Sequence, residues 1–208
     1  MTDDDPTRET PPRSLRADAA RNREALLSAA GQVFVASGVD APIREIAAAA
    51  GVGIGTIYRH FPKRSDLIVA VYRHQIEGCA AAGPALLAEA ASPLVALRAW
   101  CSRFVDFLAT KHGLAGAMGS DASGYEALHR HFIDRLVPVC ARLIAAAAEA
   151  GEIRADVRAY ELMRAIGNLC IGGGPDYDPR RMVTVLLDGL AVGAGGTSTG
   201  SPEQVGGG

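Results

Sequence analysis

Apolar residues along most of the chain recur every three or four positions, which is the spacing of one face of an α-helix. Between residues 21 and 36 one such stripe consists of Leu26, Leu27, Ala30, Val33 and Phe34. No segment shows the alternation of β-branched and polar residues that a half-buried strand requires. Aromatic residues make up only 5% of the chain, so the core must consist mainly of Ala, Leu, Val and Ile, which suits close-packed helices. The pattern therefore predicts an all-α fold.

Glycine and proline residues divide this helical pattern into segments. Gly38 and Gly51 follow the first two predicted helices, and Pro62 ends the third. In the first part of the chain we expect helices over residues 21–36, 42–50, 54–61 and from 64 onward. Further along we expect helices over residues 83–89, 93–111, 125–150, 158–170 and 179–192.

The net charge of −2 hides a contrast along the chain. Residues 21–74 contain seven basic and four acidic side chains, whereas residues 75–208 contain eleven basic and fourteen acidic ones. A basic segment joined to an acidic one suggests that the first part contacts a polyanion. Ordinary scatter also produces an excess of this size, so charge alone leaves both interpretations open.

The composition argues against several other classes of protein. No apolar run reaches the length of about 18 residues that a membrane span needs, and the acidic start MTDDDPTRETPPRS is unlike a signal peptide. The four cysteines lie far apart without Cys-x-x-Cys spacing, which is typical of reduced thiols in a cytoplasmic protein. No Ser/His/Asp or Cys/His arrangement stands out, so we expect neither an enzyme nor a cofactor.

Two motifs that suggest other ligands are set aside. Gly51, Gly53 and Gly55 are not preceded by a strand, which a phosphate-binding glycine loop requires. His129 and His131 point to roughly opposite sides of a helix, which is poor geometry for one metal ion. We expect no metal site.

Residues 43–61 have the plan of a helix-turn-helix. Ala47 is small where two helices must approach, Gly51 permits the turn, and Ile57 anchors the second helix from inside. The predicted turn is three residues long, as in DNA-binding proteins of this type.

The outward face of the second of these helices is rich in hydrogen-bond donors, namely Thr56, Tyr58, Arg59 and His60. Hydroxyl groups bind phosphate oxygens, and Arg44 on the preceding helix can reach a guanine edge or a phosphate. Enzyme surfaces also carry short helices of this kind. The geometry favours DNA binding but leaves that alternative open.

The segment GVGIGTIYRHFPKRSDL points to a family. Residues 22–72, which contain it, closely resemble the DNA-binding domain of TetR-family (tetracycline-repressor-like) transcriptional regulators. The resemblance implies a homodimer in which each subunit places its third helix in the major groove of a palindromic operator. By position, the implied DNA contacts are Arg44, Gly55, Thr56, Tyr58, Arg59, His60 and Arg64.

Two positions depart from the family pattern. Pro42 stands where a Ser or Thr usually caps the second helix, which makes Asp40 a candidate cap and puts one phosphate contact in doubt. Gly53 stands where a Ser often caps the recognition helix. We therefore expect a recognition helix that is looser without DNA than with it.

The remaining chain resembles the family only in helical layout and length. In the family this domain binds a small effector, and its last two helices form the dimer; by order these are residues 158–170 and 179–192. The last helix carries an apolar stripe that suits packing across a twofold axis, although it equally suits the interior of one chain. The stripe consists of Met182, Val185, Leu186, Gly189 and Leu190.

The implied effector is a largely apolar small molecule, because the candidate lining is mostly aromatic, Ala and Leu with few charges. Core packing accounts for most of these candidates, and we expect two or three of them to touch a ligand. They are Trp100, Phe104, Phe107, Met118, Tyr125, Phe132 and Asn168.

Together these features predict a cytoplasmic, all-α transcriptional regulator without a membrane partner. The expected activity is repression at a palindromic operator, with release by a small-molecule effector. The alternative is a helical protein–protein adaptor with a vestigial DNA-binding domain. The predicted regions are a flexible arm (1–20), a helix-turn-helix domain (21–68), an effector-binding and dimerisation domain (69–194) and a disordered tail (195–208).

Overall fold

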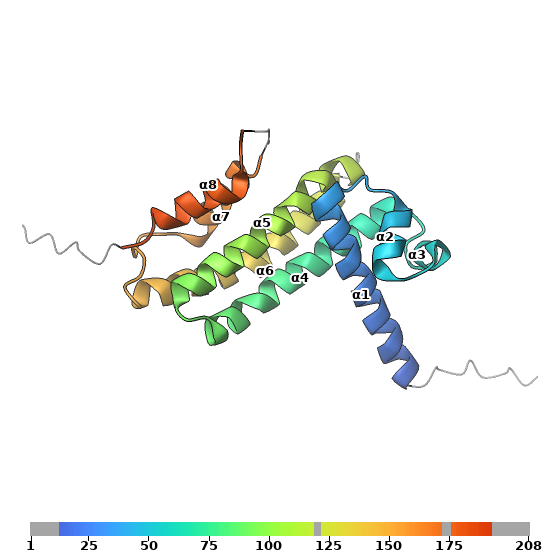
Figure 1. Cartoon of the computed structure of the whole chain (residues 1–208), viewed down its shortest axis with the longest axis horizontal. Coiled ribbons are helices and arrows are strands. Elements are labelled where there is room, and N and C mark those ends of the chain that lie inside the picture. Colours follow the sequence, from blue (N-terminus) through green and yellow to red (C-terminus); the bar gives the residue numbers. More distant parts are fainter. Residues whose placement is uncertain (1–12, 119–121, 172–175, 193–208) are drawn as a thin grey trace, which may run out of the picture. The chain divides into compact units, whose positions relative to one another are not determined.

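The computed structural model describes residues 13–118, 122–171 and 176–192, which form helices joined by loops (Figure 1). The helices are α1 (Arg13–Ser37), α2 (Ile43–Ala50), α3 (Ile54–His60), α4 (Arg64–Glu89), α5 (Pro93–Met118), α6 (Ala122–Glu149), α7 (Ala159–Leu169) and α8 (Pro179–Asp188). No strand occurs in these ranges beyond an isolated bridge between Ile153 and Ala191. The predicted all-α fold is confirmed. No helix in the described ranges is both long and apolar enough to cross a membrane.

α1 begins at Arg13, well before the predicted start at residue 21. Its residues 17–25 are exposed, so this part of the helix carries no apolar stripe for sequence reasoning to detect. The predicted arm is thus helical from Arg13 onward. Its residues 1–12, and the predicted tail over 195–208, lie outside the described residues.

α4 and α5 are also longer than predicted. α4 continues through Gly83 and Pro84, where the sequence predicts a separate helix over 83–89. A proline inside a helix removes one hydrogen bond and bends the helix, but it does not have to end it. α5 continues to Met118, into a segment whose glycines predict flexibility.

The chain forms two compact units. The first comprises Met1–Ala82 with Ser102–Leu136, and the second comprises Gly83–Cys101 with Val137–Gly208. α4, α5 and α6 each contribute residues to both units. The units do not follow the sequential boundary after residue 68, so that functional boundary stays a prediction.

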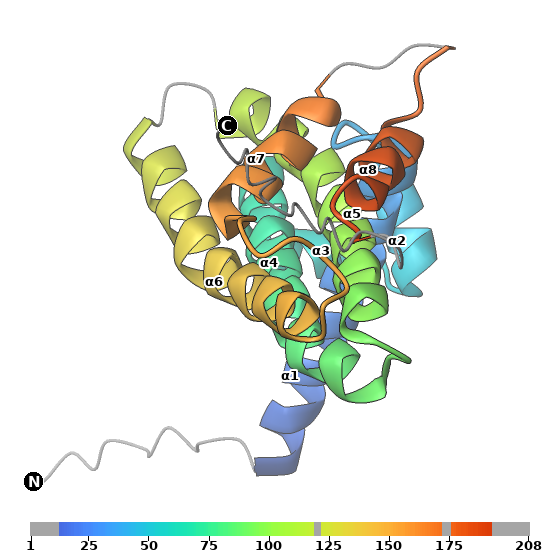
Figure 2. The same ribbon diagram turned by 90° about the vertical axis from the view of Figure 1, so that its left-hand side faces the viewer.

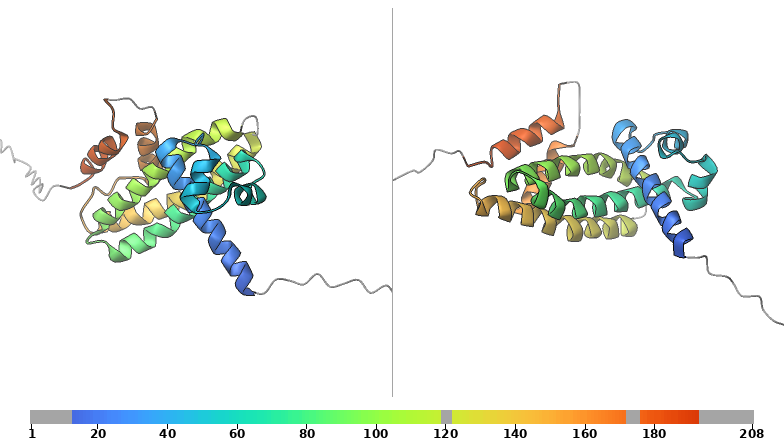
Figure 3. Two further views of the ribbon diagram at one scale, coloured as in Figure 1. Left: turned by 45° about the vertical axis from the view of Figure 1, so that its right-hand side comes forward. Right: turned by 60° about the horizontal axis from the view of Figure 1, so that its bottom comes forward.

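In the first unit, α2 packs against α1, and α3 packs against α2 (Figure 3). Buried apolar side chains on α1 to α4 include Leu26, Phe34, Ile46, Ile57 and Leu67. An aromatic cluster continues the core: the ring centroid of Phe107 lies 5.0 Å from that of Tyr72 and 5.6 Å from that of Phe132. The helix-turn-helix is therefore held by an apolar core of its own unit.

In the second unit, α7 and α8 lie side by side (Figure 2). Val183 and Leu187 of α8 are buried. Asp178 caps α8, because its Oδ1 accepts a hydrogen bond from the backbone N–H of Arg180 at 2.9 Å. Asp188 at the other end forms an ion pair with Arg98 of α5 at 2.6 Å.

The start of α5 is capped by a side chain from the loop after α6. Oε2 of Glu152 accepts hydrogen bonds from the backbone N–H of Leu94 at 2.6 Å and from the Ser92 hydroxyl at 3.1 Å. A carboxylate at a helix N-terminus satisfies otherwise unpaired N–H groups and interacts favourably with the helix dipole. Glu152 thus joins two helices of the second unit that are distant in sequence.

Replacing Glu152 with Ala should lower the free energy of unfolding by about 1–2 kcal/mol, because the N–H of Leu94 loses its charged acceptor. Denaturant titration followed by helical circular dichroism measures this loss. Glu149→Ala, at an exposed position on α6, is the matched control and should change stability by less than about 0.5 kcal/mol. Equal losses in the two variants would contradict the capping role.

Candidate nucleic-acid interface

The turn between α2 and α3 depends on one glycine. Gly51 has a φ of 65°, in the left-handed region that residues with a Cβ rarely adopt. Its N–H donates to the carbonyl of Ala48 at 3.2 Å, and the N–H of Val52 donates to that of Ala47 at 3.0 Å. These bonds close the end of α2 and direct the chain into α3.

The inner side of the motif is packed as the sequence predicts. Ile46 and Ile57 are fully buried, and Ala47 is 5% exposed. α3 has only seven residues, too few for a stable isolated helix. Its orientation therefore comes from this tertiary packing, with Ile57 as the anchor.

The outer side of the motif carries the predicted DNA contacts. Gly55, Arg59 and His60 are exposed, Thr56 is half-buried, and Tyr58 is 51% exposed. These five residues thus lie together on one short helix, pointing away from the anchor residue.

Arg44 of α2 is exposed as well, so the basic groups are not confined to α3. Within the described part of the chain, Arg44, Tyr58 and Arg59 make no hydrogen bond or ion pair with another residue. Their polar groups are available to an external partner.

Neither short helix has a side-chain cap. Pro42 and Gly53 occupy the two N-cap positions, and no side chain accepts a hydrogen bond from either helix start. The suggestion that Asp40 caps α2 is therefore wrong; that residue is exposed. Backbone carbonyls take the place of a side-chain cap, because the N–H of Glu45 donates to the carbonyl of Pro42 at 2.9 Å.

Arg64 has an intramolecular role that the family resemblance does not imply. Its Nη2 donates hydrogen bonds to the carbonyl oxygens of Val39 and, at 2.6 Å, of Ala41. Both carbonyls lie in the segment that leads into α2. The first turn of α4 thus holds the start of the helix-turn-helix.

α1 contacts both the residue that follows α3 and a side chain on α4. The guanidinium of Arg23 lies over the ring of Phe61, 5.4 Å from its centroid, just after α3 ends. The Ser28 hydroxyl and Nε2 of His74 on α4 are 2.9 Å apart. α1 therefore links the end of the recognition helix to α4.

Four of the seven predicted effector-pocket residues are buried, and their role toward an effector stays a prediction. Trp100, Phe104, Phe107 and Phe132 are at most 5% exposed. Asn168 is exposed on α7. The side chains of the other two candidates, Met118 and Tyr125, lie outside the described residues.

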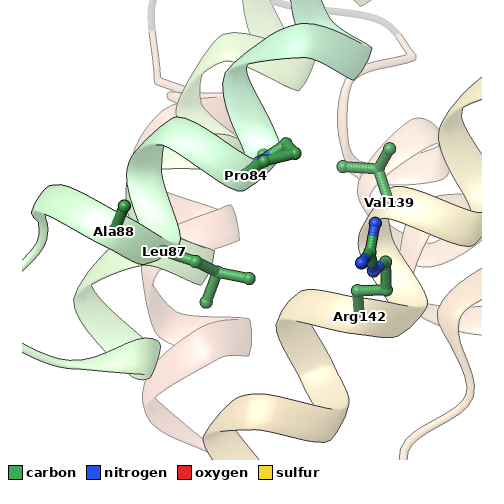
Figure 4. A pocket seen from close by; sticks show the side chains of 6 residues that line it. Pro84, Leu87, Ala88, Val139 and Arg142 are labelled. Carbon is green, nitrogen blue, oxygen red and sulfur yellow. The ribbon is translucent and has the colours of Figure 1, made fainter.

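The second unit contains a pocket of about 360 Å³ elsewhere, between the C-terminal part of α4 and α6 (Figure 4). Its lining residues are Gly83, Pro84, Leu87, Ala88, Val139 and Arg142. None of the seven predicted residues is among them. Five of the six are apolar, and Arg142 supplies the one charge.

Several titratable side chains of the described residues are paired with one another or buried. No cluster of three His, Cys, Asp or Glu side chains is present among the described residues. His131 instead pairs with Glu77 at 3.0 Å, and the hydrogen bonds from Arg135 hold the pKa of the Glu77 carboxyl below its usual value. Burial raises the pKa of the Cys79 thiol to about 12, so that thiol stays protonated at neutral pH.

Two family descriptions match the chain in separate segments. Residues 26–71 match the family "Bacterial regulatory proteins, tetR family", and residues 92–192 match "Transcriptional regulator SbtR-like, C-terminal domain". The TetR transcriptional regulator SCO0520 from Streptomyces coelicolor is 38% identical, with a TM-score of 0.68 over 83% of this chain and 99% of its own. The chain belongs to the TetR family of transcriptional regulators. A second TetR regulator, from Mycobacterium vanbaalenii, is 36% identical, with a TM-score of 0.62 over 86% of this chain and 99% of its own.

Curated relatives named as HTH-type transcriptional repressors match over a shorter part. The repressor LfrR of Mycolicibacterium smegmatis is 46% identical over 54 residues, which are 26% of this chain and 28% of LfrR. The repressor BepR of Brucella suis is 45% identical over 60 residues, which are 28% of this chain and 29% of BepR. The chain thus matches less than a third of the length of these relatives.

Sequence reasoning missed the role of Arg64 and the pocket on α4 and α6. Arg64 occupies a position that the TetR-family resemblance assigns to DNA, and its contact with a loop some 25 residues earlier leaves no local signal. The sequence contains a partial signal of the pocket, because Gly83 and Pro84 are unusual inside a helix. Sequence reasoning took that signal for a helix end.

Replacing Arg64 with Ala should lower the free energy of unfolding by about 1–2 kcal/mol, because two carbonyls lose a charged donor. Arg59→Ala on α3 is the matched control: it should leave stability within about 0.5 kcal/mol and weaken DNA binding only. Denaturant titration of both variants measures the difference. If Arg64→Ala is as stable as the parent chain, the holding role is wrong.

Proposed function

We propose that this chain is a homodimeric transcriptional repressor that binds a palindromic DNA operator and is released from it by a small molecule. The main support for the proposal is the set of hydrogen-bond donors on the outer face of α3. Tyr58 and Arg59 have no hydrogen-bond or ion-pair partner within the described part of the chain, and the buried Ile57 fixes the opposite face of the helix. Exposed Arg and Tyr side chains on a short helix anchored by a buried Ile suit the major groove, whose width admits one helix. Membership of the TetR family supports the same conclusion.

The donors divide by what they can contact. Arg44 and Arg59 have planar guanidinium groups that match the O6 and N7 acceptors of guanine or a phosphate. The Tyr58 hydroxyl suits a phosphate oxygen, which fixes position without reading sequence. We assign base reading to the arginines and positioning to Tyr58.

Replacing Arg44 with Ala should weaken operator binding by about 1–3 kcal/mol and relax preference at one base pair. Tyr58→Phe should weaken binding to all sequences by about 1 kcal/mol, because it loses one phosphate contact. Fluorescence anisotropy with the operator and a scrambled duplex separates the two effects. Arg130→Ala, on the exposed face of α6, is the control, and unchanged binding in both test variants would refute this placement of the DNA face.

The second half of a palindrome requires a second subunit, and α8 offers a surface for it. Val183 and Leu187 point into the chain and are buried. On another side of the helix, Val185 is 53% exposed, and Met182 and Leu186 are only half-buried. A helix with one apolar side buried and another left open suits packing against a second copy across a twofold axis.

Leu186→Glu should therefore produce monomers that stay helical and lose operator affinity, because a charge enters the interface. Thr184→Glu places the same charge on the opposite, exposed side of α8 and should leave the dimer intact. Sedimentation velocity measures both variants. A dimer that persists in Leu186→Glu would place the interface elsewhere.

Release by a small molecule needs a helix that responds to the ligand and to DNA. A ligand changes DNA affinity only if it binds the competent and incompetent conformations differently. α4 carries Arg64, which holds the loop before α2, and Leu87, which lines the pocket of the second unit. A typical coupling of about 1–3 kcal/mol would lower operator affinity by one or two orders of magnitude.

The same observations bear on the other classes of function. An adaptor with a vestigial DNA-binding domain does not explain why Arg44, Tyr58 and Arg59 stay without internal partners. The matched relatives are named as transcriptional repressors, and we propose the same non-enzymatic role for this chain.

A further inference from the structure

We infer that the pocket between α4 and α6 binds an amphiphile with a single anionic head group, such as a medium-chain carboxylate. The apolar walls would take the hydrocarbon part, and Arg142 would bind the anion. This deepens the proposed function, on which its regulatory consequence rests, by naming the chemistry of the effector.

The walls of the pocket come from two helices that are close at one point and separate beside it. A side chain added at Gly83 would overlap Val139, so α4 and α6 touch there only because Gly83 has none. Next to this contact, Pro84 interrupts the hydrogen bonding of α4, and Pro138 does the same in α6. The pocket occupies the space beside the contact.

The two sides of the pocket differ in chemistry. Figure 4 shows Pro84 and Leu87 on α4 facing Val139 and Arg142 on α6. The side chains on the α4 side are all apolar, whereas the α6 side carries the guanidinium group of Arg142, which is exposed. A ligand that fills the pocket therefore needs an apolar body with one polar end.

Arg142 has no competing partner within the described part of the chain. It forms no ion pair there. Arg135, on the same helix as Arg142, instead donates hydrogen bonds from two of its nitrogens to Glu77 on α4. A guanidinium presents a planar pair of donors that matches a carboxylate, and it repels an ammonium group. The charge at this position selects the head group of the ligand, whereas the walls select only for apolar surface.

The size of the pocket limits the ligand. A volume of about 360 Å³ lies near the lower end of the range for small-molecule sites, about 300–1,000 Å³. This suits a medium-length chain rather than a long one. Octanoate, octanol and octylamine are all eight-carbon molecules, with a negative, a neutral and a positive head group. They therefore separate the contribution of the apolar walls from that of the charge on the head group.

Isothermal titration calorimetry of the full chain with these three probes tests the inference. Octanol is the more apolar molecule and would bind more tightly than octanoate if the walls alone decided. Arg142 is exposed, and with its contact we expect this order to reverse, with octanoate binding up to about fivefold more tightly than octanol, the upper range for an exposed ion pair. Octylamine should bind most weakly.

Three variants and one control show which residues determine the affinity and the head-group preference. Arg142→Gln should abolish the preference for octanoate, and Arg142→Lys should retain part of it, since the positive charge remains. Leu87→Trp should weaken all three probes, because the larger ring fills the pocket. Arg130→Gln makes the same substitution on an exposed part of α6 and should change nothing.

Two results would overturn the inference: octanoate that does not bind, or a preference for octanoate that persists in Arg142→Gln. Operator affinity with and without octanoate is measured separately. Octanoate that binds through Arg142 but leaves operator affinity unchanged would support the site and refute the release step of the proposed function. Operator binding without any octanoate binding would refute the site and leave the DNA-binding proposal standing.

Discussion

The hydrogen bonds from Arg64 to the carbonyls of Val39 and Ala41 hold the start of the helix-turn-helix, whose outer face we propose as the DNA-binding surface. They join the first turn of α4 to the segment that starts α2, a helix without a side-chain cap. α2 in turn positions α3 through buried Ile46, Ala47 and Ile57 and the left-handed Gly51 turn. The position of the donors on α3 thus depends, through α2, on the contacts that the first turn of α4 makes.

α4 is one of three helices with residues in both units, and it is the one whose first turn contacts the helix-turn-helix. It is continuous from Arg64 to Glu89, although it contains Gly83 and Pro84. A ligand between α4 and α6 would contact Leu87 near its other end. Because one helix carries both sets of contacts, we propose that regulation acts by moving or stabilising α4 rather than by changing α3 directly.

The sequence predicted the features that depend on local rules. Apolar spacing, the turn glycine and the buried Ile57 defined the helix-turn-helix, since each follows from neighbouring residues. Contacts between distant segments were not predictable in this way: nothing near Arg64 indicates a bond to Val39, and nothing near Leu94 indicates a cap from Glu152.

The pocket between α4 and α6, which we propose as the effector site, shows a second limit of prediction from sequence. Aromatic residues such as Trp100 and Phe107 are typical both of ligand sites and of cores, and here they are buried. The pocket arises instead where Gly83 lets two helices touch and Pro84 interrupts one of them. Such a space depends on helix geometry, which apolar spacing does not specify.

The central claim is that a dimer reads a palindrome through α3, and sequencing of the genomic fragments that the purified chain protects from nuclease tests it most directly. The account predicts protected sites with twofold symmetry, whose half-sites are separated by about one helical turn of DNA, or a multiple of it. Protection without a shared sequence, or protection of single half-sites without symmetry, would contradict it.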